Sequence, residues 1–451
     1  MNGTKRDWSE RRLHFIGIGG AGMSGLALVC ARLGATVTGS DRSDSSYMER
    51  LREAGLGPAV GHDAANLPGE GVEVVVSTAI GKDNPELALA RERGLAPIHR
   101  GALLAELCAE KRLIAVAGTH GKTTTTAMTV WALRAIGADP AFFVGGEVPG
   151  LGPDGGTANA GWGEGEWVVA EADESDASFL QLQPEVAVVT NVEMDHHTRW
   201  GSLAELHEAF RSFIAPARGL VVPADEEMGW LGNGGEEVRF DSMFPGSPDL
   251  RLAVPGQHNL RNARAALGAI ELAGLDSTAA SAALTSFAGV HRRLQLKGSR
   301  GAVHIYDDYA HHPTEVRAAL SALRELEPSR LIAVFQPHLY SRTKALASDF
   351  GAALTLADEV VVLDVYPARE EPVGELAGVS GLQVAQAAAE RAGGRPVWWL
   401  PEREAARRAL VTLLDRSQES GGALVTIGAG DVFKLGEALL NEPVAPAGAA
   451  P

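Results

Sequence analysis

Short apolar runs alternate with amphipathic stretches along most of the chain, and this pattern predicts an α/β protein built on parallel sheets. Ligands bind where the strands of such sheets end, so the polar residues at these ends are the candidates for function. The predicted strands cover residues 13–16, 35–41, 72–78, 113–117, 141–144, 167–171, 186–190, 303–306, 331–335, 360–363 and 424–427. The predicted helices include residues 26–33 and 85–93, and others begin near residues 122, 257 and 313.

At 451 residues the chain is too long for a single core, and its elements group into three predicted domains. We place an N-terminal domain at residues 1–108, a central domain at residues 109–290 and a C-terminal domain at residues 291–445. The last residues, 446–451, are rich in alanine and proline, and we expect this tail to be disordered.

Composition excludes several classes of protein. The net charge is −17, from 40 basic and 57 acidic residues, which argues against non-specific nucleic-acid binding. Cys30 and Cys108 lie in apolar stretches, so we expect buried thiols rather than a disulfide framework or a zinc site. The polar N-terminus lacks a signal-peptide core and no apolar run reaches the length of a membrane span, which predicts a cytoplasmic protein without a membrane partner.

A glycine loop follows the apolar run at residues 113–117 and predicts a nucleotide phosphate site. Glycines free the backbone amides to face phosphate oxygens, Lys122 adds a positive charge, and Thr123 can reach a magnesium ion. The motif is a shortened form, because Val116 stands where the general pattern has a further glycine. The predicted ATP-binding residues of this loop are Gly118, Thr119, His120, Gly121, Lys122, Thr123 and Thr124.

A second glycine loop lies near the N-terminus, between the first predicted strand and helix. Its spacing fits the dinucleotide fingerprint, and Asp41 follows at the distance expected of a ribose-binding carboxylate. The pattern indicates either NAD or another pyrophosphate, because the loop recognises phosphate and backbone shape. The candidate residues here are Gly17, Gly19, Gly20, Ala21, Gly22, Met23, Ser24 and Asp41.

Acidic residues and histidines follow two further strands. Four carboxylates lie between Glu171 and Asp176, and the strand before them places Glu171 at the sheet edge of the phosphate loop, as a magnesium ligand would require. The segment 191–197 repeats this pattern, with two histidines at its end, and suggests a second metal position. The glycine-rich tract between them, residues 145–165, is predicted to be a flexible loop, which we interpret as substrate-facing.

The remaining polar clusters lie further along the chain. Asn259 and Asn262 share one face of a predicted helix, where they either cap it or contact an adenine edge. Paired arginines follow at residues 292–293, near the expected start of the third domain. In that domain, polar residues at 307–313 and 335–343 come directly after strands, so we expect them along one crevice.

Taken together, these motifs resemble the Mur ligases of bacterial cell-wall synthesis, and most closely the alanine-adding branch of that family. The murein peptide ligases, which attach recycled tripeptides, share the N-terminal and central motifs and are the alternative. The resemblance spans all three domains and is carried by residues 17–24, 118–125, 171–176, 191–196, 256–262, 307–313 and 335–343.

The resemblance implies a Rossmann-like N-terminal domain for the UDP moiety, a P-loop ATPase-like central domain for ATP and Mg²⁺, and a Rossmann-like C-terminal domain for the amino acid. The reaction would join L-alanine to the lactyl carboxylate of UDP-N-acetylmuramate through an acyl phosphate. It implies that Thr123, Glu171 and His196 are metal ligands and that Lys122 holds phosphates. It also assigns Asn262, Arg293 and Asp308 to ATP, and His311, His312, His338 and Arg342 to the amino acid and reaction centre.

A histidine near neutral pKa suits the proton of the attacking amine, and the sequence does not choose among His311, His312 and His338. One position departs from the family: Leu339 stands where the alanine-adding enzymes usually carry an arginine. Two other functions explain less of the sequence. A nicotinamide-dependent oxidoreductase explains only the first glycine loop, and a regulatory protein that binds nucleotide without catalysis does not explain the retained Lys122, Glu171 and His196. The oligomeric state is not predictable from the sequence.

Overall fold

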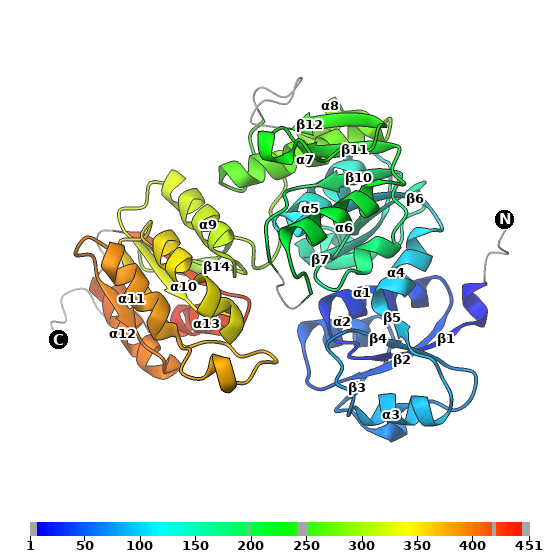
Figure 1. Ribbon diagram of the computed structural model, residues 1–451, viewed down its shortest axis with the longest axis horizontal. Coiled ribbons are helices and arrows are strands. Elements are labelled where there is room, and N and C mark those ends of the chain that lie inside the picture. Colours follow the sequence, from blue (N-terminus) through cyan, green and yellow to red (C-terminus); the bar gives the residue numbers. More distant parts are fainter. Residues whose placement is uncertain (1–6, 196–198, 241–249, 417–420, 444–451) are drawn as a thin grey trace. The chain divides into compact units, whose positions relative to one another are not determined.

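The predicted strands and helices form three separate β-sheets in the computed structural model, which describes residues 7–195, 199–240, 250–416 and 421–443 (Figure 1). The predicted α/β fold class is thereby confirmed. The chain divides into two compact units, one of Met1–Leu252 with Leu260–Ala288, the other of Ala253–Asn259 with Gly289–Pro451. Within the described ranges, no helix is long and apolar enough to cross a bilayer.

The first sheet has five strands in the order β3-β2-β1-β4-β5, and all its pairings are parallel. The order changes direction between β1 and β4, so the first glycine loop begins at the switch point of the sheet. Cys30 and Cys108 are buried free thiols, as predicted. The elements are β1 (Arg12–Ile16), α1 (Ala21–Arg32), β2 (Thr36–Asp41), α2 (Ser46–Glu53), β3 (Ala59–Val60), β4 (Glu73–Val76), α3 (Pro85–Glu92), β5 (Ile98–His99) and α4 (Arg100–Cys108).

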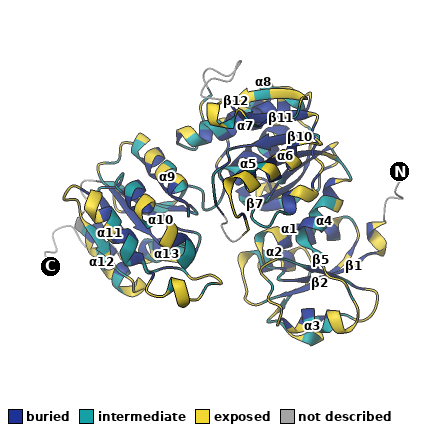
Figure 2. Cartoon of the chain, viewed as in Figure 1, coloured by how far each residue is buried: buried dark blue, intermediate teal, exposed yellow. Residues whose placement is uncertain are grey.

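The second sheet belongs to the same unit and has the order β12-β11-β10-β6-β9-β7-β8, in which only the β7–β8 pair is antiparallel. β6 lies inside this sheet and is almost wholly buried, which explains its unbroken apolar run (Figure 2). The elements are β6 (Arg112–Ala117), α5 (Lys122–Ala135), β7 (Ala141–Pro149), β8 (Thr157–Gly161), β9 (Trp167–Glu171), β10 (Val186–Val189), α6 (Leu203–Ile214), β11 (Gly219–Pro223), β12 (Glu236–Phe240), α7 (Gln257–Leu272) and α8 (Ser277–Leu284).

The prediction of a flexible loop over residues 145–165 was wrong. Part of this tract extends β7, and β8 pairs with it. Its glycines allow close packing: a Cβ atom on Gly161 would lie 2.5 Å from the ring of Phe142. β8 also packs on α1, where a Cβ on Gly25 would approach Ala160 to 2.8 Å. Small residues at this contact therefore let α1, which belongs with the first sheet, pack closely against β8 of the second sheet.

The second unit contains a six-stranded sheet in the order β13-β14-β18-β15-β16-β17, parallel except for the β13–β14 pair. Residues 446–451, predicted to be a disordered tail, lie outside the described residues. Several short strands here and elsewhere, such as β13 and β17, were not predicted. The elements are β13 (Gln295–Arg300), β14 (Val303–Asp308), α9 (Pro313–Glu325), β15 (Leu331–Phe335), α10 (Tyr340–Leu354), β16 (Glu359–Val362), α11 (Gly381–Arg391), β17 (Val397–Trp399), α12 (Arg403–Arg416), β18 (Gly422–Ile427) and α13 (Phe433–Asn441).

Candidate active site

The loop between β6 and α5 has the backbone shape that its glycines predict. Gly118 has φ +134° and Gly121 has φ +81°, conformations that side-chain-bearing residues rarely adopt. A Cβ on Gly118 would overlap the hydroxyl of Thr190, and one on Gly121 would lie 2.6 Å from Asn262 Oδ1. Both glycines are therefore required by the conformation and by close neighbours, and Asn262 lies against the loop.

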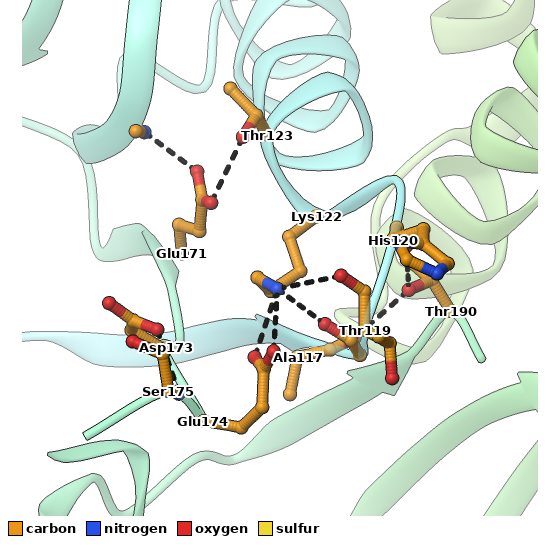
Figure 3. Close-up of polar contacts among 12 residues, drawn as sticks. Ala117, Thr119, His120, Lys122, Thr123, Glu171, Asp173, Glu174, Ser175 and Thr190 are labelled. Atoms are coloured by element: carbon orange, nitrogen blue, oxygen red, sulfur yellow. Dashed lines mark hydrogen bonds and ion pairs between the residues drawn. The ribbon is translucent and has the colours of Figure 1, made fainter. Parts of the chain in front are cut away.

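The segment after β10 holds this loop from the side. The His120 amide donates to Asn191 Oδ1 at 2.9 Å, and the His120 carbonyl accepts from Asn191 Nδ2 at 2.9 Å. The same carbonyl accepts from the Thr190 hydroxyl at 2.5 Å (Figure 3). The Thr119 hydroxyl exchanges hydrogen bonds with the backbone of Glu193. This bracing fixes the loop before any ligand arrives. His196, predicted as a metal ligand from the same segment, lies outside the described residues.

Lys122 extends into the centre of the loop. Its Nζ donates to the carbonyls of Gly118 and Thr119 at 2.6 and 3.1 Å, and it pairs with Glu174 at 2.9 Å (Figure 3). Burial by itself lowers the pKa of Lys122, but Glu174 and then Asp173 outweigh that effect and raise it. The loop therefore contains a permanent positive charge surrounded by backbone groups, which suits a bound polyphosphate.

Glu171, the last residue of β9, lies beside Thr123 in the first turn of α5. Glu171 Oε1 accepts from the Thr123 hydroxyl at 3.0 Å, and its Oε2 accepts from the amide of Gly145 at 2.7 Å (Figure 3). These are hard oxygen donors, the class that magnesium prefers. Thr124 is buried in the same helical turn. The two predicted metal ligands that the structure describes are thus brought together.

Sequence reasoning gave a role to Glu171 but none to the other acids of its cluster. Glu174 has a side chain only 2% exposed, and its carboxylate pairs with Lys122. Asp173 and Asp176 pair with Arg100, at 2.5 and 2.9 Å. Burial raises the pKa of Asp173, but Arg100 and then Lys122 more than reverse this, so it lies well below its usual range. The sequence showed that carboxylates are dense between residues 171 and 176. It did not show which basic residue each of them pairs with.

The first glycine loop is held by β2. The amides of Gly17 and Ile18 donate to the Ser40 carbonyl at 2.8 and 3.0 Å, and the Gly19 amide donates to Asp41 Oδ2 at 2.9 Å. Asp41, predicted as a ribose ligand, therefore also fixes the loop. The other predicted residues of this loop follow at the start of α1: Gly20, Ala21, Gly22, and the buried Met23 and Ser24. The Ala21 carbonyl accepts from Asn159 Nδ2 of β8 at 2.6 Å.

A buried polar network lies beneath this loop and was not predicted. Glu86 of α3 is fully buried and accepts from His14 at 2.7 Å, Ser40 at 2.6 Å and His62 at 3.1 Å. Burial raises the pKa of Glu86, but these hydrogen bonds and one from Asn66 bring it down to about 2. The network joins β1, β2 and the segment after β3, so it ties together the strands from which the loop and Asp41 emerge.

Asp308, in the second unit, lies at the end of β14 and was predicted as an ATP contact. Its carboxylate accepts from the amides of Leu294 and Ala310, each at 2.7 Å. Burial raises the pKa of Asp308 to about 7, although Arg293 opposes the rise. Arg293 lies 3.6 Å from Glu315 of α9. The contact of Arg293 and Asp308 with ATP stays a prediction.

The predicted amino-acid residues gather within the second unit. The rings of His311 and His338 meet edge to face with centroids 6.2 Å apart, and His338 Nδ1 lies 3.4 Å from Arg342. His312 caps α9: its Nδ1 accepts from the Thr314 amide at 3.4 Å. Asn259 Nδ2 donates to the Pro255 carbonyl at 2.7 Å and fixes the start of α7.

Comparison with known proteins gives the family. Three models of one family match the chain: "Mur ligase family, catalytic domain" at residues 12–112, "Mur ligase middle domain" at 116–243 and "Mur ligase, glutamate ligase domain" at 292–430. Among curated relatives, the UDP-N-acetylmuramate–L-alanine ligase of Renibacterium salmoninarum is 43% identical over 97% of both chains. That of Rubrobacter xylanophilus is 44% identical over 95% of this chain and 99% of its own.

Solved structures agree with this. A UDP-N-acetylmuramate–alanine ligase of Thermotoga maritima matches with a TM-score of 0.75 and 28% identity, over 95% of this chain and 98% of its own. A murein peptide ligase of Psychrobacter arcticus matches with a TM-score of 0.68 and 26% identity, over the same shares of both chains. The resemblance predicted from the motifs is thereby confirmed.

Proposed function

This chain belongs to the Mur ligase family, and we propose that it joins L-alanine to the lactyl carboxylate of UDP-N-acetylmuramate with the hydrolysis energy of ATP. The observation that carries the proposal is the Lys122 ammonium at the centre of a braced glycine loop, beside the Thr123–Glu171 pair. An NAD-dependent oxidoreductase would not need a second phosphate-binding loop of this kind. The names of the curated relatives support the alanine-adding reaction.

The chemistry explains why such a loop is needed. A carboxylate is a poor electrophile, so the lactyl carboxylate oxygen first attacks the γ-phosphorus of ATP, and the bond to ADP breaks. This attack brings two anions together, and Lys122 lowers the barrier by offsetting their repulsion. The amine of alanine then attacks the acyl carbon, phosphate leaves, and the amine loses a proton. The product is an amide, with ADP and phosphate released.

The described residues fit a magnesium ion at this site. The Thr123 hydroxyl and the Glu171 carboxylate are adjacent oxygen donors at the edge of the phosphate loop, and we propose them as its ligands, with His196 as a further candidate from the sequence. When bound, magnesium neutralises charge on the phosphates and orients them. The protein's own part is to keep these oxygens in place, through the amide of Gly145 and the helix α5.

We propose that the second unit binds the amino acid. His311, His338 and Arg342 lie together there. The arginine can hold the carboxylate of the amino acid, and a neutral histidine can accept the proton of its amine. His312 is the weaker candidate for the base, because its Nδ1 already caps α9. The ATP contacts of Asn262, Arg293 and Asp308 remain predictions. The reaction would run in the cytoplasm, where cells keep ATP and nucleotide-activated sugars.

One assay tests the proposal. Purified protein is supplied with ATP, Mg²⁺ and UDP-N-acetylmuramate, and separately with L-alanine, glycine, L-serine or an alanyl tripeptide as acceptor. The expected result is phosphate release with L-alanine and a product heavier by one alanyl residue in the mass spectrum. Release only with the tripeptide would reassign the protein to the murein peptide ligase reaction. Silence with every acceptor would contradict the ligase function itself.

A further inference from the structure

Arg100 is a charged residue at the end of the first sheet to which the motifs assign nothing. It is the first residue of α4, directly after β5, so it lies at the carboxyl edge of that sheet. Its Nη2 donates to Asp173 at 2.5 Å and to Asp176 at 2.9 Å, in the acidic segment after β9. Two carboxylates on one nitrogen fix the guanidinium in place, while its side chain stays 24% exposed.

The other terminal nitrogen of Arg100 lies against the first glycine loop. A Cβ on Gly22 would be only 3.2 Å from Nη1, so the guanidinium sits directly beside the first turn of α1. Among the described residues no hydrogen bond is formed by Nη1. One arginine thus has one nitrogen on the acidic segment and the other at the loop.

The first glycine loop lacks a positive charge of its own. Residues 17–24 include neither lysine nor arginine, whereas the second loop contains Lys122. Backbone amides and a helix N-terminus attract a diphosphate, but its two negative charges are held far better with a cation beside them. Arg100 is the cation that the fold places at Gly22.

We propose that Arg100 binds the diphosphate of the sugar-nucleotide substrate through Nη1 while Nη2 stays paired with Asp173 and Asp176. The planar guanidinium suits this arrangement, because its donors diverge and serve two anionic groups at once. Asp173 precedes Glu174, the carboxylate that holds Lys122, so Arg100 links the substrate diphosphate to the phosphate loop by a short series of contacts. This inference rests on the proposed function.

The test is direct binding of UDP-N-acetylmuramate, without ATP, by titration calorimetry. Arg100→Gln should weaken this binding by about 10- to 100-fold, the effect of losing a hydrogen bond to a charged group. Binding of a non-hydrolysable ATP analogue should change by less than about three-fold, since Lys122 and its loop are intact. Arg100→Lys should recover part of the loss, because it keeps the charge without the second donor.

Two controls separate binding from support of the fold. Arg32→Gln removes an exposed arginine at the far end of α1 and should leave both affinities unchanged. Asp176→Asn removes one ion pair of Arg100, while the positive charge of Arg100 remains. Its sugar-nucleotide affinity should therefore fall by less than about three-fold. All variants are checked by thermal unfolding.

The outcomes are distinguishable. A folded Arg100→Gln variant that binds the sugar nucleotide as tightly as the wild type would overturn the inference and leave the proposed function standing. Equal losses of UDP-N-acetylmuramate affinity in Arg100→Gln and Asp176→Asn would also overturn it, since Arg100 would then only support the local structure. A wild-type protein that neither binds UDP-N-acetylmuramate nor forms product would contradict the proposed function first.

Discussion

The two glycine loops of the first unit look alike in the sequence and work differently in the structure. Each follows a buried strand and leads into a helix. The second loop is locally complete, because Lys122 and Thr123 follow directly on its glycines and the charge is in the loop itself. The first is assembled from distant segments: Asp41 holds its backbone, and Arg100 of α4 lies beside Gly22.

The glycines themselves differ in purpose. In the second loop Gly118 and Gly121 have left-handed φ values. In the first loop only Gly17 has one, at +83°, and Gly19 is needed for space instead. A Cβ on Gly19 would be 3.0 Å from Asp41 and Met48. A glycine pattern in a sequence therefore does not reveal whether a glycine is needed for its φ value or for the close approach of a neighbouring side chain.

The largest expected effect is the loss of the charge within the second loop. Lys122→Met should lower kcat of the ligation by about 10³-fold, as the removal of a group that stabilises the transition state does. ADP release measured with saturating substrates gives the value. Lys82→Met, at an exposed position of the N-terminal domain, should have no effect. If kcat of the Lys122→Met variant stays within tenfold of the wild-type value, the charge inside the second loop does not distinguish the two loops in function.

Next in size is the acid sensitivity of the strands beneath the first loop. The pKa of Glu86 is depressed in the fold, so its contribution to stability is present above pH 4.5 and is lost as the pH falls toward 2. Glu86→Gln should lower the free energy of unfolding by on the order of 3 kcal/mol at pH 7 and by much less near pH 3. The ionisable groups that face Glu86 are His14 and His62. Hydrogen exchange of the β1 and β2 amides measures this locally.

The matched control is Glu92→Gln, on an exposed position of the same helix α3, which should be neutral at both pH values. A cost for Glu86→Gln that does not change between pH 7 and pH 3 would contradict the charged state assigned to this carboxylate.

The backbone difference between the loops predicts a smaller contrast. Gly118→Ala requires a left-handed alanine that overlaps Thr190, and should destabilise the first unit by about 2 kcal/mol and abolish ATP binding. Gly20→Ala has φ −74° and nothing nearer than 3.6 Å, so it should cost less than about 1 kcal/mol. Calorimetric unfolding of both variants checks the pair. Equal costs would remove the distinction between conformational and spatial glycines.

The smallest effect is expected on the first turn of α5. Thr123→Val keeps the shape but removes the hydroxyl beside Glu171, and should weaken the apparent affinity for Mg²⁺ in the assay about tenfold. Thr125→Val is the control, because its hydroxyl is buried without a hydrogen-bond partner in the described part of the chain. It should be neutral or slightly stabilising. Similar losses in both variants would argue for a packing effect.

Much of this protein is determined locally and is therefore readable in the sequence. Strand–helix alternation, the buried run of β6, the glycine loop with Lys122, and Glu171 at a strand end all follow from patterns within a few residues. Such patterns depend on backbone geometry and on burial of the nearest side chains. The fold class and the backbone shape of the loop after β6 therefore follow from the sequence.

What only the tertiary structure decided are the partners of charged groups distant in the chain. That Glu174 holds Lys122, that Arg100 joins Gly22 to Asp173, and that Glu86 gathers two histidines depends on the order of strands in the sheets. The strand β8 was missed for the same reason, since its Gly161 packs against Phe142 of β7. A sequence states which charges exist, and the sheet order sets the distances between them, which decide their pairing.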